Sequence, residues 1–259
     1  MKSEKELAFL REIKIDEEWT QRFTNNFDDN FKFSDEKNIL YVNSGIGNHT
    51  LAIREICDQA VEITALCETE ELHNIADAKA KAIKSKVNFT TLSPFESFEL
   101  VIADASFTKP SELDESFSDI AAYSDNKIAI FLPTAGSFGE IFSLLWESLL
   151  NTGLLDHSEE VERLILEIPT VSQIEEKLKK LGFKKIQAFT KLEAFGYENS
   201  NEFIESTLIA DFLSPSWLSF LNNKEQAKLL KQLVKLIDSE SAQISFAFSL
   251  KSTLFVGQK

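Results

Sequence analysis

The sequence predicts an α/β fold built on a largely parallel sheet, and three observations support this. From residue 37 onward, short apolar runs alternate with amphipathic stretches of helical periodicity, which is typical of parallel strands joined by crossover helices. The apolar run at 39–42 ends in a turn with two glycines, and an amphipathic stretch follows at once. That succession places a ligand loop at the carboxyl end of a first strand. The stretch at 171–181 carries helix signals at both ends, because Thr170 and Gln173 form a capping-box pattern and Gly182 stands where a left-handed cap is expected.

The elements follow in a regular order along the chain. Residues 4–27 predict a helix, since apolar positions recur mostly at spacings of three and four, and Asp28–Asn30 is expected to break it. Strands are expected near 38–43, 61–67, 86–92, 98–104, 126–132 and 184–194. Helices are expected near 49–59, 69–83, 111–122, 137–151 and 171–181. The alternation stops after Tyr197; two or three helices are expected within 200–239, and a closing strand from Ile244 to Val256.

The composition excludes several classes of function. The chain has 27 Lys and Arg against 42 Asp and Glu, a net charge of −15, so its surface repels phosphate backbones and anionic membranes. We therefore expect neither nucleic acid nor a membrane as a partner. Two cysteines and three scattered histidines predict no disulfide framework and no metal site. The start of the chain lacks the layout of a signal peptide and no apolar run is long enough to span a bilayer, so a cytoplasmic location is expected.

Four residues near the expected strand ends are candidates for a site. Gly45 and Gly47 can adopt positive φ and let the backbone approach a bound group. Asp104 ends the expected fourth strand, where ligands bind in open α/β sheets; it either orients or deprotonates a nucleophile or caps the following loop. His49 either faces the ligand crevice as a base or lies on the first turn of the next helix.

The order of elements over roughly residues 36–259 resembles the class I, Rossmann-like methyltransferases that depend on S-adenosylmethionine (SAM). Five segments carry the resemblance: the glycine loop, the second strand with its helix, the fourth strand, the last crossover helix and the final strand, at Leu40–Gly47, Ile63–Leu72, Phe98–Asp104, Ile174–Phe183 and Leu254–Lys259. The resemblance implies a doubly wound, mostly parallel seven-stranded sheet. It also implies N-terminal helices at 1–35, a Rossmann-like core at 36–198, a helical insert or cap at 199–242 and the closing strand of the core at 243–259.

The family's cofactor-binding positions are changed in this chain. Tyr41 stands where the family has an acidic residue that holds the amino-acid part of SAM, and Asn43 replaces the first glycine of the loop. Cys67 stands where an acidic residue grips the ribose hydroxyls, with Glu68 one position further on. Ser93 matches the acidic residue that bonds the adenine amino group. The resemblance thus implies degenerate cofactor motifs.

The segment Asp104–Phe107 is similar to the Asp-Pro-Pro-Phe/Tyr signature of amine-methylating members, without its two prolines. From their positions in the sequence, Asp104 and His49 are the candidate catalytic residues, and Asp104 is also a candidate for cofactor binding.

Three functional hypotheses remain. The first is SAM-dependent methyl transfer to a small-molecule acceptor. The second is a catalytically degenerate methyltransferase-fold protein, a pseudoenzyme that acts as a subunit or binds a protein partner, because Tyr41, Cys67 and Ser93 replace three acids. The third, a nicotinamide-binding Rossmann enzyme, is the weakest, since Thr50 occupies the third glycine position of that motif. The methyl acceptor and the oligomeric state cannot be read from the sequence.

Overall fold

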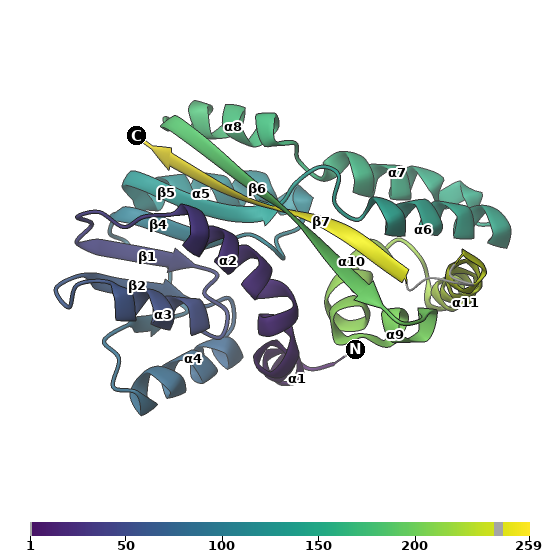
Figure 1. The fold of residues 1–259 in the computed structure, drawn as a ribbon, viewed down its shortest axis with the longest axis horizontal. Helices are drawn as coiled ribbons and strands as arrows, with labels where there is room; N and C mark the ends of the chain where they lie inside the picture. Colours follow the sequence, from purple (N-terminus) through teal and green to yellow (C-terminus); the bar gives the residue numbers. More distant parts are fainter. Residues whose placement is uncertain (1, 241–245) are drawn as a thin grey trace. The chain divides into compact units, whose positions relative to one another are not determined.

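The computed structural model describes residues 2–240 and 246–259 (Figure 1). The strands are Asn38–Val42 (β1), Glu62–Leu66 (β2), Asn88–Thr90 (β3), Phe98–Asp104 (β4), Ser124–Pro133 (β5), Lys184–Tyr197 (β6) and Phe246–Gln258 (β7). The α-helices are Glu4–Leu10 (α1), Gln21–Asn30 (α2), Asn48–Ile56 (α3), Glu70–Ala82 (α4), Leu113–Tyr123 (α5), Gly139–Thr152 (α6), Ser158–Glu167 (α7), Val171–Lys180 (α8), Ser200–Glu205 (α9), Ser214–Trp217 (α10) and Asn223–Glu240 (α11). Two π-helical segments, Arg11–Thr20 (η1) and Leu208–Leu213 (η4), and two 3₁₀ turns, Pro110–Glu112 (η2) and Leu155–His157 (η3), complete the described elements.

The strands form one seven-stranded sheet in the order β3-β2-β1-β4-β5-β7-β6, which confirms the predicted α/β fold. From β3 to β5 each strand is parallel to its neighbours. The order reverses at β1, with β2 and β3 on one side and β4 and β5 on the other, and this creates a switch point at the carboxyl ends of β1 and β4. Figure 1 shows β7 running against the directions of β5 and β6, so the sheet is mostly parallel with an antiparallel end.

The chain divides into two compact units. Unit 1 comprises residues 1–132, 171–190 and 253–259, and unit 2 comprises residues 133–170 and 191–252. Strands β5, β6 and β7 contribute residues to both units. All residues that the sequence singles out as candidates for a site lie in unit 1.

Helices cover both faces of the sheet in unit 1, as a doubly wound fold requires. One face packs against α5 and α8 through a buried cluster that includes Leu40, Val101, Ile130, Phe117 and Leu178. The other face packs against α2, where Phe131 of β5 lies 6.1 Å from the ring of Phe23 and 6.5 Å from that of Phe27. Ile130 and Phe131 serve opposite faces because successive side chains of a strand alternate.

The N-terminal segment of unit 1 is helical from Glu4 to Asn30. A capping box between Ser3 and Glu6 begins it, and η1 interposes ten π-helical residues between α1 and α2. The predicted break at 28–30 is wrong by three residues, because the Asn30 side chain donates to the Asn26 carbonyl oxygen at 2.9 Å and holds the last turn. Chain direction changes at Phe31 instead, which has extended backbone.

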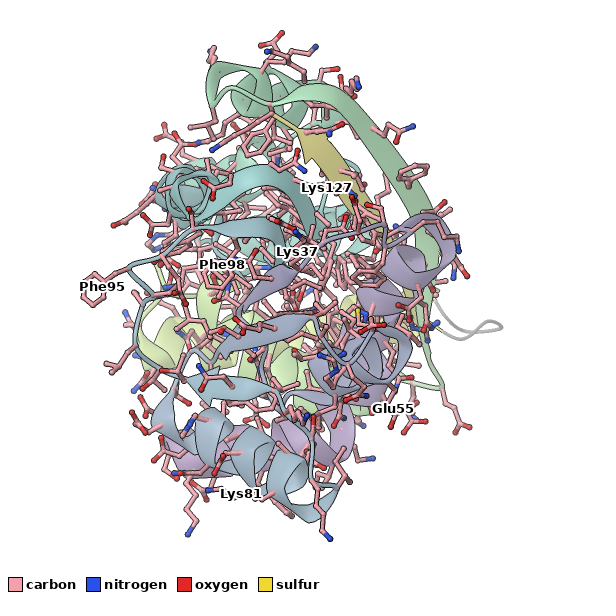
Figure 2. All side chains as sticks on the ribbon, turned by 90° about the vertical axis from the view of Figure 1, so that its left-hand side faces the viewer. Lys37, Glu55, Lys81, Phe95, Phe98 and Lys127 are labelled. Carbon is pink, nitrogen blue, oxygen red and sulfur yellow. The ribbon has the colours of Figure 1, made fainter. Side chains whose placement is uncertain are left out.

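The connection from α2 to β1 is fixed by a buried acid. Glu36 accepts hydrogen bonds from the Ser34 backbone and hydroxyl at 2.7 and 2.8 Å. It also forms an ion pair with Lys127, which is labelled in Figure 2 and lies 5.4 Å from the centre of the Phe31 ring. These contacts tie the end of the N-terminal segment to the start of β5.

Unit 2 contains an α-helix that the sequence reasoning missed. Only Val161 of α7 is buried, and Ile165 and Leu166 are exposed, so its apolar residues do not mark one buried face. The aromatic residues of this unit pack on one another: the rings of Phe195 and Phe248 stack at 4.8 Å.

Several predicted boundaries shift. β3 is three residues long where seven were expected at 86–92, and β5 and β6 extend beyond their expected ends. β7 continues to Gln258, and the expected start of the closing strand at Ile244 lies outside the described residues. Within the described ranges, no helix is long and apolar enough to cross a membrane.

Candidate functional site

The glycine loop after β1 adopts the strained geometry that its sequence predicts. Asn43, Gly45 and Gly47 have φ angles of 55°, 55° and 79°, all in the left-handed region. Glycine occupies this region freely, and asparagine tolerates it better than most residues. The Asn43 side chain donates to the Asp104 carbonyl oxygen at 2.9 Å, which joins the carboxyl ends of β1 and β4.

Gly47 packs too closely for any side chain. A Cβ at this position would lie 2.7 Å from Phe89 Cζ and 2.9 Å from Ala76 Cβ, whereas a Cβ on Gly45 would lie 3.5 Å from an Arg11 nitrogen. The two glycines therefore have different tasks. Gly47 lets the loop approach β3 and α4, and Gly45 presents its backbone toward the N-terminal segment.

Glu68 brings a carboxylate to the glycine loop. The backbone N–H of Gly45 donates to Glu68 Oε2 at 3.0 Å, and Arg11 donates to Oε1 at 2.5 Å. Cys67 turns the other way: its side chain is buried, and its Sγ lies 3.2 Å from the Ser44 hydroxyl. Burial raises the pKa of the Cys67 thiol to about 11, so the thiol stays neutral. At the end of β2, the acid beside the loop is thus Glu68 and not the residue at 67.

The carboxyl group of Asp104, at the end of β4, is hydrogen-bonded and has a raised pKa. Its Oδ1 accepts a hydrogen bond from the Ser106 backbone at 2.8 Å, and Trp19 Nε1 donates to the Ser106 hydroxyl at 3.1 Å. Burial raises the pKa of Asp104 to about 6, although the Ser106 hydrogen bonds and the charge of Arg11 oppose that shift. A carboxyl group with a pKa near 6 can accept or release a proton close to neutral pH.

Tyr41 and His49 form a hydrogen-bonded chain with Asp28. The Tyr41 hydroxyl lies 2.8 Å from His49 Nδ1, and His49 Nε2 lies 3.1 Å from Asp28 Oδ1. Since the Asp28 carboxylate can only accept, His49 Nε2 donates to it, and Nδ1 is left for the hydrogen bond with the Tyr41 hydroxyl. His49 lies on the first turn of α3, which is one of the two positions predicted for it. Both of its ring nitrogens have hydrogen-bond partners.

The surroundings of Tyr41 are strongly acidic. Its side chain is 2% exposed, and its pKa is raised well above the usual value, first by burial and then by four carboxylates, those of Asp104, Asp28, Glu68 and Asp16. The same field would stabilise a cation at this edge of the sheet.

The N-terminal segment contributes residues that sequence reasoning missed. Arg11 and Asp28 contact the predicted site residues directly, and Asp16 accepts from Asn48 at 2.8 Å. Trp19 stacks on Phe107 with ring centres 5.3 Å apart. No motif or spacing marks these residues, because they meet the loop only through the fold.

Ser93 lies in the loop that follows β3. It is exposed three residues beyond the end of β3, in the same loop as Phe95, whose side chain projects away from the protein in Figure 2. The hydrogen bonds that join Tyr41, Asn43, His49 and Asp104 to their neighbours do not involve it. Among the described residues, no group of three or more His, Cys, Asp or Glu side chains is placed to hold a metal ion.

Of the comparisons with known proteins, only the comparison with solved structures found similar proteins. No protein-family model matches the sequence. No curated protein matches it either. The structure is similar to that of the YcgJ protein from Bacillus subtilis, with 13% identity, a TM-score of 0.57 and coverage of 92% of this chain and 98% of that one.

Two further similar structures differ in their chemistry. One is phosphoethanolamine N-methyltransferase 2 from Haemonchus contortus, solved with phosphomonomethylethanolamine and S-adenosylhomocysteine (16% identity, TM-score 0.54, 99% of this chain and 58% of that one). The other is the cyclase SpnF (15% identity, TM-score 0.51, 92% of this chain and 80% of that one). The chain therefore has the class I methyltransferase fold.

Proposed function

We propose that the protein is a SAM-dependent methyltransferase that acts on a small-molecule acceptor. The observation that carries the proposal is the position of Glu68, whose carboxylate lies over the glycine loop at 3.0 Å from the Gly45 nitrogen. In the class I fold a carboxylate at the end of β2 is the group that receives the ribose hydroxyls of the cofactor. Glu68 thus takes over the role that the substitution at Cys67 would otherwise remove.

The residues of the site fit the cofactor in shape and charge. Gly45 carries no side chain between its backbone and Arg11, and Gly47 lets the loop pack closely against Phe89 and Ala76. SAM carries a positive sulfonium and a positive ammonium group, and the carboxylates around Tyr41 favour cations. Tyr41 itself cannot form an ion pair, so the acidic surroundings replace the single acid of the family motif.

When bound, SAM would supply an activated methyl group for direct displacement by a nucleophile. The protein then has to align the acceptor and exclude water from the reacting groups. Trp19 is fully buried and stacks on Phe107 beside Asp104, which provides an apolar cover at the end of β4. We assign the role of proton acceptor to Asp104, with its pKa of about 6, rather than to His49, whose ring nitrogens both have partners.

One observation favours the alternative function, a methyltransferase-fold protein that binds a protein partner without catalysis. The Arg11 side chain is paired with Glu68 next to the glycine loop, where a cofactor would need Glu68 for itself. If this arrangement is permanent, SAM has no acceptor for its ribose and the domain acts through its surface.

Isothermal titration with SAM and S-adenosylhomocysteine tests the proposal. We expect saturable binding of one ligand per chain, and a loss of at least about tenfold in affinity for Glu68→Gln, because charge-assisted hydrogen bonds contribute about 1.5–3 kcal/mol. Glu62→Gln is the matched control, since Glu62 is exposed at the opposite end of the same strand. Absence of binding to wild-type protein at millimolar ligand would refute the proposal and favour the alternative. Binding that Glu68→Gln leaves unchanged would refute the assigned role of Glu68.

A further inference from the structure

Arg11 is a cation of the N-terminal segment that reaches the glycine loop. It is the first residue of η1, and its side chain is 19% exposed. The guanidinium group has three neighbours: the Glu68 carboxylate at 2.5 Å, the face of the Phe107 ring at 4.9 Å from its centre, and the open side of Gly45, where a Cβ would lie 3.5 Å from Arg11. Arg11 therefore covers the loop on the side where Gly45 offers its backbone.

These neighbours make a binding site for a cation. A carboxylate pairs with positive charge, and an aromatic face attracts a cation within about 6 Å of its centre. Asp104 adds to the negative field, since the charge of Arg11 lowers the pKa of that carboxyl against the larger effect of burial. The guanidinium group of Arg11 thus occupies the position between Glu68 and Phe107, which suits a positively charged group.

We propose that Arg11 is a built-in competitor of the cofactor for Glu68, so that SAM binds only when the guanidinium leaves Glu68 and frees the carboxylate for the ribose hydroxyls. This inference rests on the proposed function and adds a regulatory contact to the same site. Ligand affinity is then reduced by the free energy of the Arg11–Glu68 contact, and any change that weakens this contact raises the affinity.

The rest of η1 is anchored, so the change needed is small. Glu12 forms an ion pair with Lys79, and Asp16 accepts a hydrogen bond from Asn48 at 2.8 Å. Trp19 is buried at the other end of the segment. Because these contacts do not depend on Arg11, rotation of one long side chain opens Glu68 without displacing the helix.

The test is calorimetric titration of SAM and S-adenosylhomocysteine into wild-type protein, Arg11→Gln and Lys14→Gln. Lys14→Gln removes the same charge from an exposed position of the same π-helical segment, so it measures the general effect of lost positive charge. We expect Arg11→Gln to bind on the order of tenfold more tightly than both wild type and Lys14→Gln. Arg11→Lys keeps the charge and loses the planar fork and the stacking on Phe107, so an intermediate affinity is expected. It also serves as the second variant if Arg11→Gln does not fold.

The outcomes separate this inference from the proposed function. Measurable binding by wild type, with binding on the order of tenfold tighter by Arg11→Gln than by wild type and Lys14→Gln, supports the competitor role. Equal affinities of wild type and Arg11→Gln overturn it while the proposed function stands. Weaker binding by Arg11→Gln also overturns it, because Arg11 would then help to hold the ligand. If neither protein binds either ligand, the proposed function fails and the inference fails with it.

Discussion

Replacement of Gly47 by alanine should destabilise the protein more than any other single-methyl change in the glycine loop. Two effects add at this position. A left-handed backbone conformation costs a residue with a Cβ roughly 1–2 kcal/mol, and Gly47 has a φ of 79°. The new methyl would also meet Phe89 at 2.7 Å and Ala76 at 2.9 Å, closer than real Cβ contacts. Both neighbours are buried and cannot move freely, so overpacking adds roughly 1–3 kcal/mol.

The matched variant is Gly45→Ala. Gly45 has the same left-handed backbone with a φ of 55°, but its new methyl would meet only Arg11, at an ordinary contact distance of 3.5 Å. Urea unfolding followed by circular dichroism should show a loss of about 2–5 kcal/mol for Gly47→Ala and about 1–2 kcal/mol for Gly45→Ala. Equal losses would refute the reasoning, since they would mean that Phe89 and Ala76 do not press against the loop.

Three further predictions concern the buried polar groups of the site. Burial raises the pKa of Asp104 from 3.8 to about 6, so the folded state holds this proton more tightly than the unfolded chain and stability falls as the pH rises through about 4 to 6. Asp104→Asn should therefore exceed wild type by up to about 3 kcal/mol at neutral pH and match it below about pH 4, and a difference that does not depend on pH in urea titrations would contradict the shift. Tyr41→Phe removes the hydrogen bond between the Tyr41 hydroxyl and His49 Nδ1 and should cost about 1–2 kcal/mol in the same assay, whereas no loss would mean that the bond contributes nothing. With a disulfide reagent at about pH 8, Cys57 should react in the folded protein and Cys67 only on unfolding, because burial raises the pKa of Cys67 to about 11; two thiols labelled in the folded state would disprove this.

The sequence was sufficient to predict the sheet and the geometry of its first loop. Strand-length apolar runs alternating with helical periods leave few arrangements other than a parallel sheet, and glycines after the first strand fix where its ligand edge lies. The left-handed positions at Gly45, Gly47 and Gly182 are confirmed, since only glycine occupies such positions without strain. These are local signals, in which a residue type and its own backbone conformation determine each other.

Side-chain direction at the end of β2 could not be predicted in the same way. Residue 67 aligns with the family's acidic position, yet the strand ends at Leu66, and the next two residues point to different partners. Cys67 faces Ser44, and Glu68 faces the Gly45 nitrogen. A shift of the strand end by one residue changes which side chain faces the loop. The ends of strands are the least certain part of a prediction from sequence.

The contribution of the N-terminal segment was also beyond the reach of sequence reasoning. Its helical period predicts an apolar face, and Trp19 and Phe23 are indeed buried, but a period says nothing about which polar residue of the other face meets which loop. Arg11 meets Glu68 and Asp28 meets His49 only because the segment packs on the face of the sheet beside β1. The strand-end positions supply Glu68 and Asp104, and the N-terminal segment adds Asp16 and Asp28, so that four carboxylates raise the pKa of Tyr41 in the folded site. These carboxylates supply the negative charge that the substituted motif positions lack, and our proposal is that the contact between Arg11 and Glu68 limits the affinity of the site for the cofactor.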